Sequence, residues 1–198
     1  MKLIILTGAP ASGKSSIAEA VGRKLGIDII SKDKFKIELF EKYGFTSHAE
    51  KKKLSIRGEE IMYKTIEKYI TQSLDLIVDN NFKHFNAIRD ILERTSTNVD
   101  IKCIYCVADY ELLARRYNER IRSGNRHPAL YTLNQYPVID GVSKFHPLIT
   151  KDDVERIEQG IQEFTYGQEI LELNTNNIES NFDSLCNLVI EYIAKKGR

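Results

Sequence analysis

A glycine-rich segment close to the start of the chain constrains the fold more than any other feature of the sequence. It matches the pattern G-x-x-x-x-G-K-[ST] at every fixed position, through Gly8, Ala9, Pro10, Ala11, Ser12, Gly13, Lys14 and Ser15. A short apolar run at residues 3–6 precedes it, and residues 15–25 carry apolar side chains at helical spacing. A strand, a glycine-rich turn and a helix in this order predict a phosphate-binding loop, against the weaker alternative of a chance glycine turn.

The residue types of this loop suit a nucleoside triphosphate. Glycines let backbone N–H groups turn inward around phosphate oxygens, and the following helix adds the positive end of its dipole, so Ser16 joins the predicted binding set. Lys14 can reach the β- and γ-phosphates, and the Ser15 hydroxyl is a hard oxygen ligand for Mg²⁺. We therefore predict ATP and Mg²⁺ as cofactors, although the loop alone does not reveal the fate of the γ-phosphate.

The rest of the chain alternates short apolar runs with longer segments of helical pattern. Further strands are predicted at residues 27–30, 74–78, 99–107 and 169–173. Further helices are predicted at residues 31–43, 49–73, 85–95, 110–122, 152–164 and 178–195. Residues 123–150 hold three of the four prolines and predict a long loop, as lids and binding loops have. Short buried strands between helices predict an α/β fold, a parallel sheet with helices on both faces.

Length and composition narrow the class of protein. The 198 residues fit one α/β domain, and Lys plus Arg (29) nearly cancel Asp plus Glu (28), which argues against a general nucleic-acid binder. Cys103 and Cys106 form a CxxC that invites a redox or metal interpretation, but they sit in an apolar run where a strand would point them to opposite faces. Residues 3–6 are too short for a signal peptide or membrane span, so we expect a cytoplasmic protein without a membrane partner.

Polar side chains follow the second and third predicted strands. Ligands of parallel sheets bind at the carboxyl ends of strands, so these side chains are candidates for a site. Asp33 is expected to accept a proton from an attacking hydroxyl, although it could instead cap the following helix. Asp79 closes an apolar run as a Mg²⁺-side carboxylate does, with ordinary turn chemistry as the alternative. Asn80 and Asn81 are candidates for orienting a substrate.

Five arginines gather in and after the predicted helix at residues 110–122: Arg115, Arg116, Arg120, Arg122 and Arg126. Arg116 and Arg120 share one helix face, and guanidinium groups stabilise the charge of a transferred phosphoryl group. We expect a lid over residues 115–150 in which Arg116, Arg120 and Arg126 contact phosphates. A solvated, salt-bridged helix face is the alternative. His127, beside a proline, is a weaker candidate for contacting substrate.

Taken in order, the loop at residues 8–15, Asp33, Asp79 and the Leu113-x-x-Arg116-x-x-x-Arg120 helix resemble the small P-loop kinases of the nucleoside-monophosphate-kinase type. The chain is most similar to the branch with zeta toxins, chloramphenicol phosphotransferase, the kinase domain of polynucleotide kinase and kinase-like AAA-domain proteins. The resemblance implies a three-layer P-loop NTPase fold with strand order 2-3-1-4-5. It also implies Asp33 as base, Arg116 and Arg120 as lid or transition-state groups, and Thr175 near the adenine. Lys36 departs from the arginine common in this branch.

The hypothesis that follows is an ATP-dependent phosphotransferase acting on a hydroxyl of a small molecule, with residues 1–198 as a single kinase domain. Asp33, Lys36, Asn80, Asn81 and His127 would bind the acceptor, whose identity the sequence does not give. A toxin-type or nucleic-acid-end kinase is one alternative, with the near-zero net charge counting against the second. An ATP-binding switch or slow ATPase is another. The protein could be a monomer or a homodimer.

Overall fold

A five-stranded parallel sheet forms the centre of the computed structural model, which describes residues 1–81, 86–95, 97–165 and 170–195, with backbone alone at 162–165. The strand order is β2-β3-β1-β4-β5, as predicted. The strands are β1 (Lys2–Gly8), β2 (Asp28–Ser31), β3 (Leu76–Asp79), β4 (Asp100–Val107) and β5 (Ile170–Asn174). The predicted α/β class and P-loop topology are therefore confirmed, while position 169 of the predicted fifth strand lies outside the described residues.

Helices cover both faces of this sheet because successive strand residues point to opposite sides. The helices are α1 (Lys14–Leu25), α2 (Lys32–Tyr43), α3 (His48–Thr71), α4 (Asn86–Thr95), α5 (Tyr110–Arg122), α6 (Pro128–Tyr131), α7 (Lys151–Thr165) and α8 (Ile178–Ala194). Leu3 and Ile5 pack in one buried cluster with α3 and α4, whereas Ile4 and Leu6 pack in another with α1 and α8. Among the described residues, no helix combines the length and the apolar character that crossing a membrane needs.

The CxxC pair is part of this two-faced core. Cys103 belongs to the cluster under α3 and α4, and Cys106 to the cluster under α1 and α8. Burial raises the pKa of both thiols to about 12. Thiols on opposite faces of one strand cannot share a metal ion or a disulfide, so the structure supports the packing interpretation of the motif.

Side-chain caps set where α2 and α3 begin. Ser31 and Ser47 accept hydrogen bonds from the amides of Lys34 and Glu50, at 3.2 Å each. These bonds satisfy amide groups that have no partner inside a helix. The Ser31 cap starts α2 immediately after β2, which puts the first turn of α2, including Asp33, at the carboxyl edge of the sheet.

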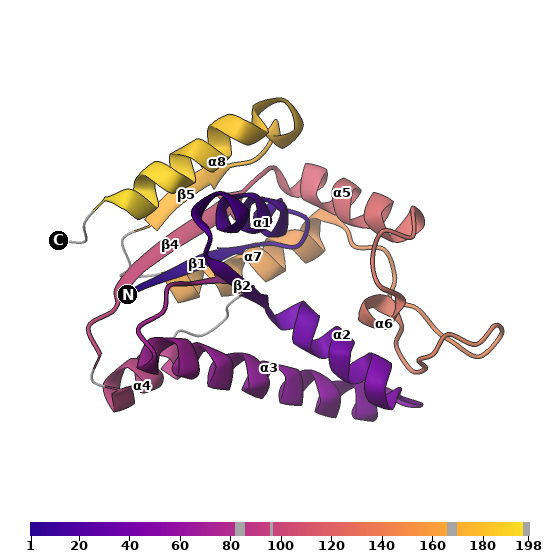
Figure 1. Cartoon of the computed structure of the whole chain (residues 1–198). Helices are drawn as coiled ribbons and strands as arrows, with labels where there is room; N and C mark the ends of the chain where they lie inside the picture. The colour runs from indigo at the N-terminus through magenta and orange to yellow at the C-terminus, as the bar shows by residue number, and fades with distance from the viewer. Residues whose placement is uncertain (82–85, 96, 166–169, 196–198) are drawn as a thin grey trace.

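The segment between α5 and α7, for which the sequence predicts a long loop, contains the single turn α6 and takes part in two isolated bridges. One bridge pairs Phe45, after α2, with Tyr136 through two backbone hydrogen bonds of 2.9 and 2.8 Å. The buried Lys51 ammonium of α3 donates to the carbonyls of Leu130 and Thr132. The segment is therefore docked on the α2–α3 pair, as the position of α6 beside α2 in Figure 1 shows.

Candidate active site

The predicted phosphate-binding loop connects β1 to α1 and leaves no room for side chains at its glycines. A Cβ on Gly8, whose φ is +142°, would lie 2.3 Å from the Cys106 carbonyl oxygen. A Cβ on Gly13, whose φ is +81°, would lie 2.3 Å from the Ile178 Cδ1 atom. Ala11 also has a positive φ, 65°, which is uncommon for a residue with a side chain. The loop is thus held in a conformation that serves its backbone amides rather than its side chains.

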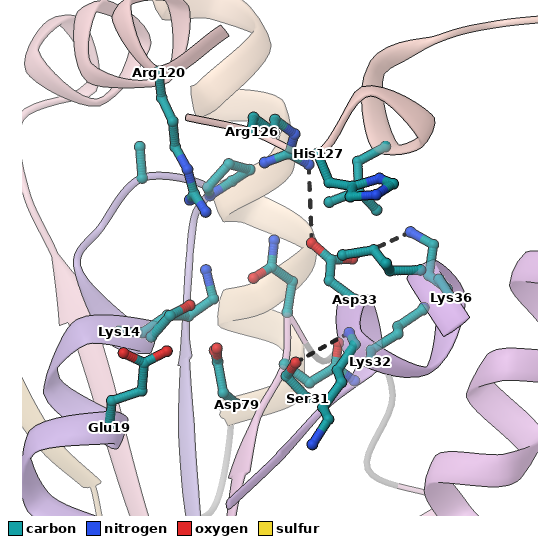
Figure 2. Close-up of a pocket in the computed structure, with 18 of the residues that line it drawn as sticks. Lys14, Glu19, Ser31, Lys32, Asp33, Lys36, Asp79, Arg120, Arg126 and His127 are labelled. Carbon is teal, nitrogen blue, oxygen red and sulfur yellow. Dashed lines mark hydrogen bonds and ion pairs between the residues drawn. The ribbon is translucent and has the colours of Figure 1, made fainter. Parts of the chain in front are cut away.

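This loop opens onto a cavity of about 930 Å³ at the carboxyl edge of the sheet. It brings together most of the residues singled out from the sequence: Pro10, Ala11, Lys14, Ser15, Asp33, Lys36, Asp79, Asn80, Asn81, Arg120, Arg126 and His127. Chain segments far apart in sequence therefore form one site, shown in Figure 2. Gly8, Ala9, Ser12, Gly13, Ser16, Arg116 and Thr175 are outside this lining.

The donor half of the cavity contains Lys14, Ser15 and Asp79. The Lys14 ammonium donates a 3.2 Å hydrogen bond to the Ala9 carbonyl of its own loop. Burial raises the pKa of Asp79, against the opposing effects of Lys14 and a hydrogen bond with Ser15. Asp79 Oδ1 is buried with no hydrogen-bond partner among the described residues. A buried carboxylate oxygen in need of a partner, next to a hydroxyl, fits Mg²⁺, which takes few protein ligands and keeps several waters.

The acceptor half of the cavity is centred on Asp33. Its carboxylate lies 3.2 Å from the Lys36 ammonium and 3.9 Å from the Arg126 guanidinium, drawn as dashed lines in Figure 2. Burial acts to raise the pKa of Asp33, but Lys36, Arg126 and Lys14 together lower it below its ordinary value of 3.8. Asp33 is consequently an ionised carboxylate at neutral pH, half exposed and pointing into the cavity.

The arginines of α5 divide between two places. Arg120 is exposed and points from α5 into the cavity (Figure 2). Arg116 instead donates to the carbonyls of Thr175 and Asn176, at 3.1 and 2.9 Å, and so ties α5 to the connection between β5 and α8. The Thr175 hydroxyl is itself committed to the Val107 carbonyl at 3.0 Å. Arg116 and Thr175 thus lie together, away from the residues that surround Asp33.

His127 has a structural role visible in its contacts. Its Nδ1 accepts a hydrogen bond from the Ala129 amide and caps α6, while Nε2 donates to Glu41 of α2 at 2.9 Å. His127 also lines the cavity.

Asn80 and Asn81 line the cavity directly after β3. The backbone N–H of Asn80 donates a 3.2 Å hydrogen bond to the Leu6 carbonyl.

Sequence reasoning missed two buried ionisable groups beside the site. Glu158 of α7 accepts a hydrogen bond from the Tyr105 hydroxyl of β4. Burial raises the pKa of Glu158, against the effects of Tyr105, the Ala9 amide and Lys14. The interactions with Ala9 and Lys14 show that this carboxyl group lies next to the phosphate-binding loop. The other group is Lys51. The sequence does not single out Glu158 among the charged residues of α7, or Lys51 among those of α3, because the hydrogen-bond partners of both residues are distant along the chain.

The fold and the cavity define the class: an α/β protein with the architecture of the small P-loop kinases. Residues 3–135 match the model of the AAA domain family AAA_33, so the chain belongs to this family. No curated protein sequence matches the chain.

Solved structures confirm the architecture over nearly the whole chain. A candidate kinase from Chloroflexus aurantiacus J-10-fl is similar with a TM-score of 0.75 at 22% identity, over 96% of this chain and 97% of that one. A gluconokinase from Sinorhizobium meliloti 1021 gives 0.57 at 14% identity, over 98% and 91% of the two chains. A shikimate kinase from Bacteroides thetaiotaomicron gives 0.55 at 18% identity, over 98% of both. At these identities the likeness concerns the fold.

Proposed function

We propose that this protein transfers the γ-phosphoryl group of ATP to a hydroxyl group of a small molecule. The observation that carries the proposal is the position of Asp33, whose ionised carboxylate lines the same cavity as Lys14, Ser15 and Asp79. A protein that only binds nucleotide needs the donor half of this cavity. A carboxylate beside it, at the end of the neighbouring strand, suits the activation of an acceptor.

In the proposed reaction, Asp33 orients the acceptor hydroxyl by accepting its hydrogen bond. The acceptor oxygen forms a bond to the γ-phosphorus as the bond to the β,γ-bridging oxygen breaks, and ADP leaves. The proton passes to Asp33 late, because a loose transition state develops little charge on the attacking oxygen. This timing suits a carboxylate of low pKa. Lys14 and Arg120 stabilise the phosphoryl oxygens.

Ser15 and Asp79 would hold Mg²⁺, which when bound neutralises charge on the β- and γ-phosphates. Arg116 and Thr175 would shape the base side of the nucleotide site from the β5–α8 connection. We further propose that residues 1–198 act as one kinase domain with residues 115–150 as its lid. The proposal includes a cytoplasmic location, where ATP is abundant and where free thiols such as the three buried cysteines persist.

A small-molecule acceptor is favoured over a nucleic-acid end. Two structural neighbours, gluconokinase and shikimate kinase, are named for small hydroxylated acceptors. The docked α6 segment also narrows the cavity next to Asp33, with Leu130 and His127 in its wall. A neighbour from the Pnkp1/Rnl/Hen1 RNA repair complex keeps the nucleic-acid alternative open to the same test.

The experiment is acceptor-dependent release of ADP from ATP across a panel of hydroxylated metabolites and a 5′-hydroxyl oligonucleotide. We expect at least one small molecule to raise ADP release well above background, and Asp33→Asn to reduce that rate about a hundredfold or more with ATP affinity unchanged. Asp90→Asn, at an exposed position of α4 outside the cavity lining, makes the same chemical change and serves as the matched control. Phosphorylation at the wild-type rate by Asp33→Asn would show that the base is elsewhere, and turnover without any acceptor dependence would favour the slow ATPase.

A further inference from the structure

The acceptor half of the cavity holds more positive charge than its own carboxylates balance. Lys36 is 18% exposed and Arg126 is 15% exposed, and both approach one carboxylate, Asp33, which is 49% exposed. Lys32 has a separate partner in Glu59 at 3.0 Å. Lys34 and Glu38 of α2 also line the cavity, whereas Glu19 and Asp79 lie on the side of Lys14 (Figure 2). Apart from the paired Lys32, three cations, Lys34, Lys36 and Arg126, therefore face two carboxylates, Asp33 and Glu38.

The Arg126 guanidinium is held in position by its neighbours and has hydrogen-bond donors that are not used among the described residues. The guanidinium lies over the ring of Tyr117, 5.1 Å from the centroid, a favourable cation–π contact. Its Nε is buried without a hydrogen-bond partner among the described residues, and the 3.9 Å approach to Asp33 is longer than a hydrogen bond. A guanidinium presents five donors in a planar fork that matches carboxylate and phosphate oxygens.

The surroundings of this pair contain further cations. Lys51 lies behind Lys36 and Arg126, and burial together with those two charges lowers the pKa of Lys51 to about 8. Burial, followed by the charges of Lys51, His48, Arg126 and Lys36, also lowers the pKa of His146. The charges of Lys36 and Arg126 thus lower the pKa values of two neighbouring groups, Lys51 and His146, and Asp33 opposes this effect at Lys51.

From these observations, and resting on the proposed kinase function, we propose that the acceptor is itself an anion. The acceptor would be an alcohol that carries a carboxylate or phosphate group, and that group would bind between Lys36 and Arg126 while its hydroxyl meets Asp33. An anionic group at this position would take the place of Asp33 as the partner of Lys36 and Arg126, and it would accept hydrogen bonds from the guanidinium of Arg126.

The competing explanation is that these cations serve ATP, as the sequence predicted for Arg126. The donor half already offers the loop amides, the start of α1, Lys14 and Arg120 to the triphosphate. Lys36 and Arg126 instead contact Asp33, the group assigned to the acceptor. Substitution of Lys36 should therefore weaken the acceptor and spare the nucleotide.

The first experiment measures anion binding without turnover. The protein is loaded with a non-hydrolysable ATP analogue and Mg²⁺, which tests the donor site separately, and is then titrated with inorganic phosphate and with acetate by calorimetry. We expect one anion site that Lys36→Met and Arg126→Gln each weaken about tenfold, with Lys42→Met unchanged. Nucleotide-loaded protein that binds neither anion, or that binds them equally well after Lys36→Met, would overturn the proposal.

The second experiment compares matched acceptors in the ADP-release assay: gluconate against glucitol, glycerate against glycerol, and glucose 6-phosphate against glucose. We expect the charged member of a reactive pair to be preferred, with a KM that rises with salt and with Lys36→Met while kcat changes little. Preference for the carboxylates or for the phosphate identifies the anionic group. Equal or better use of the neutral members would refute an anionic acceptor yet leave the kinase proposal standing, whereas absent nucleotide binding would refute the kinase proposal.

Discussion

The two halves of the cavity are built by different means. The donor half rests on the sheet: the backbone of its loop is fitted against β4 and the start of α8, with Gly8 against Cys106 and Gly13 against Ile178. The acceptor half rests on side chains of α2 and of a segment docked onto it through Phe45, Tyr136 and Lys51. The donor half is therefore specified within a few consecutive residues. The acceptor half depends on contacts between distant parts of the chain.

The largest effect is expected from removing the charge at the centre of the donor half. Lys14→Ala should abolish measurable ATP binding by calorimetry and lower kcat/KM by about a thousandfold or more, because the ammonium is the buried cation of the phosphate site. The fold should survive, since the hydrogen bond of the Lys14 ammonium goes to the Ala9 carbonyl of its own loop. ATP affinity equal to that of the wild type would remove the basis for a nucleotide site at this loop.

A smaller effect on catalysis is expected from substitution of the arginines of α5. These substitutions should distinguish Arg120, which points into the cavity, from Arg116, which contacts the β5–α8 connection. Arg120→Ala should lower kcat about a hundredfold with little change in the KM for ATP, because Arg120 points into the cavity. Arg116→Ala should mainly raise the KM for ATP, since Arg116 holds the carbonyls of Thr175 and Asn176. Steady-state kinetics of both variants decide this. The reverse pattern would assign the phosphoryl-stabilising role to Arg116.

The donor half and the sheet could be predicted from the sequence because their signals are local. The consensus loop, the apolar runs and the carboxylate after β3 are each read from a few consecutive residues, and parallel strands gather their ends at one edge. Those rules predict that Lys14, Ser15, Asp33 and Asp79 lie close together, and all four line the cavity. The strand order came from the resemblance to P-loop kinases rather than from the spacing.

The rest could not be predicted because it depends on contacts across the fold. Arg116 and Arg120 share a helix face in the sequence, yet one meets the β5–α8 connection and the other the cavity, a difference of one helical turn. The docking of Tyr136 on Phe45 and of Lys51 on the α6 segment joins residues more than 75 positions apart, which no periodicity encodes. Glu158 is one acidic residue among several in α7.

A third prediction concerns the support behind the donor loop. Glu158→Ala should reduce the free energy of unfolding by about 1–3 kcal/mol, because it leaves the buried Tyr105 hydroxyl without its acceptor. Glu158→Gln keeps an acceptor oxygen and removes the titration. Burial raises the pKa of Glu158 above its ordinary value of 4.5, so the folded state binds the proton more tightly and wild-type stability falls as pH rises through the folded pKa.

Glu158→Gln should therefore gain stability relative to the wild type as pH increases from about 4.5 upward. Urea unfolding of the wild type and both variants at several pH values measures this. Parallel pH profiles for the wild type and Glu158→Gln would mean that Glu158 does not titrate differently in the folded protein. A loss of ATP affinity in Glu158→Ala, with the Gln variant unaffected, would show that this carboxyl group supports the donor loop through Tyr105 and the Ala9 amide.

The smallest effect is expected where α3 sets the position of the acceptor half. A Cβ on Gly58 would lie 3.1 Å from Lys36 Cγ and 3.2 Å from the Lys36 amide nitrogen, so Gly58→Ala should push the first turns of α2 away by a fraction of an ångström. Gly160, in α7, has nothing within 4 Å of such a Cβ, so Gly160→Ala reports the gain in helix propensity alone, up to about 1 kcal/mol. Gly58→Ala should raise the KM for the acceptor about two- to fivefold and leave the KM for ATP unchanged, because Lys36 and Asp33 move while the donor loop stays on the sheet. Equal changes in both KM values would mean that the donor and acceptor halves of the cavity move as one unit and are not supported independently.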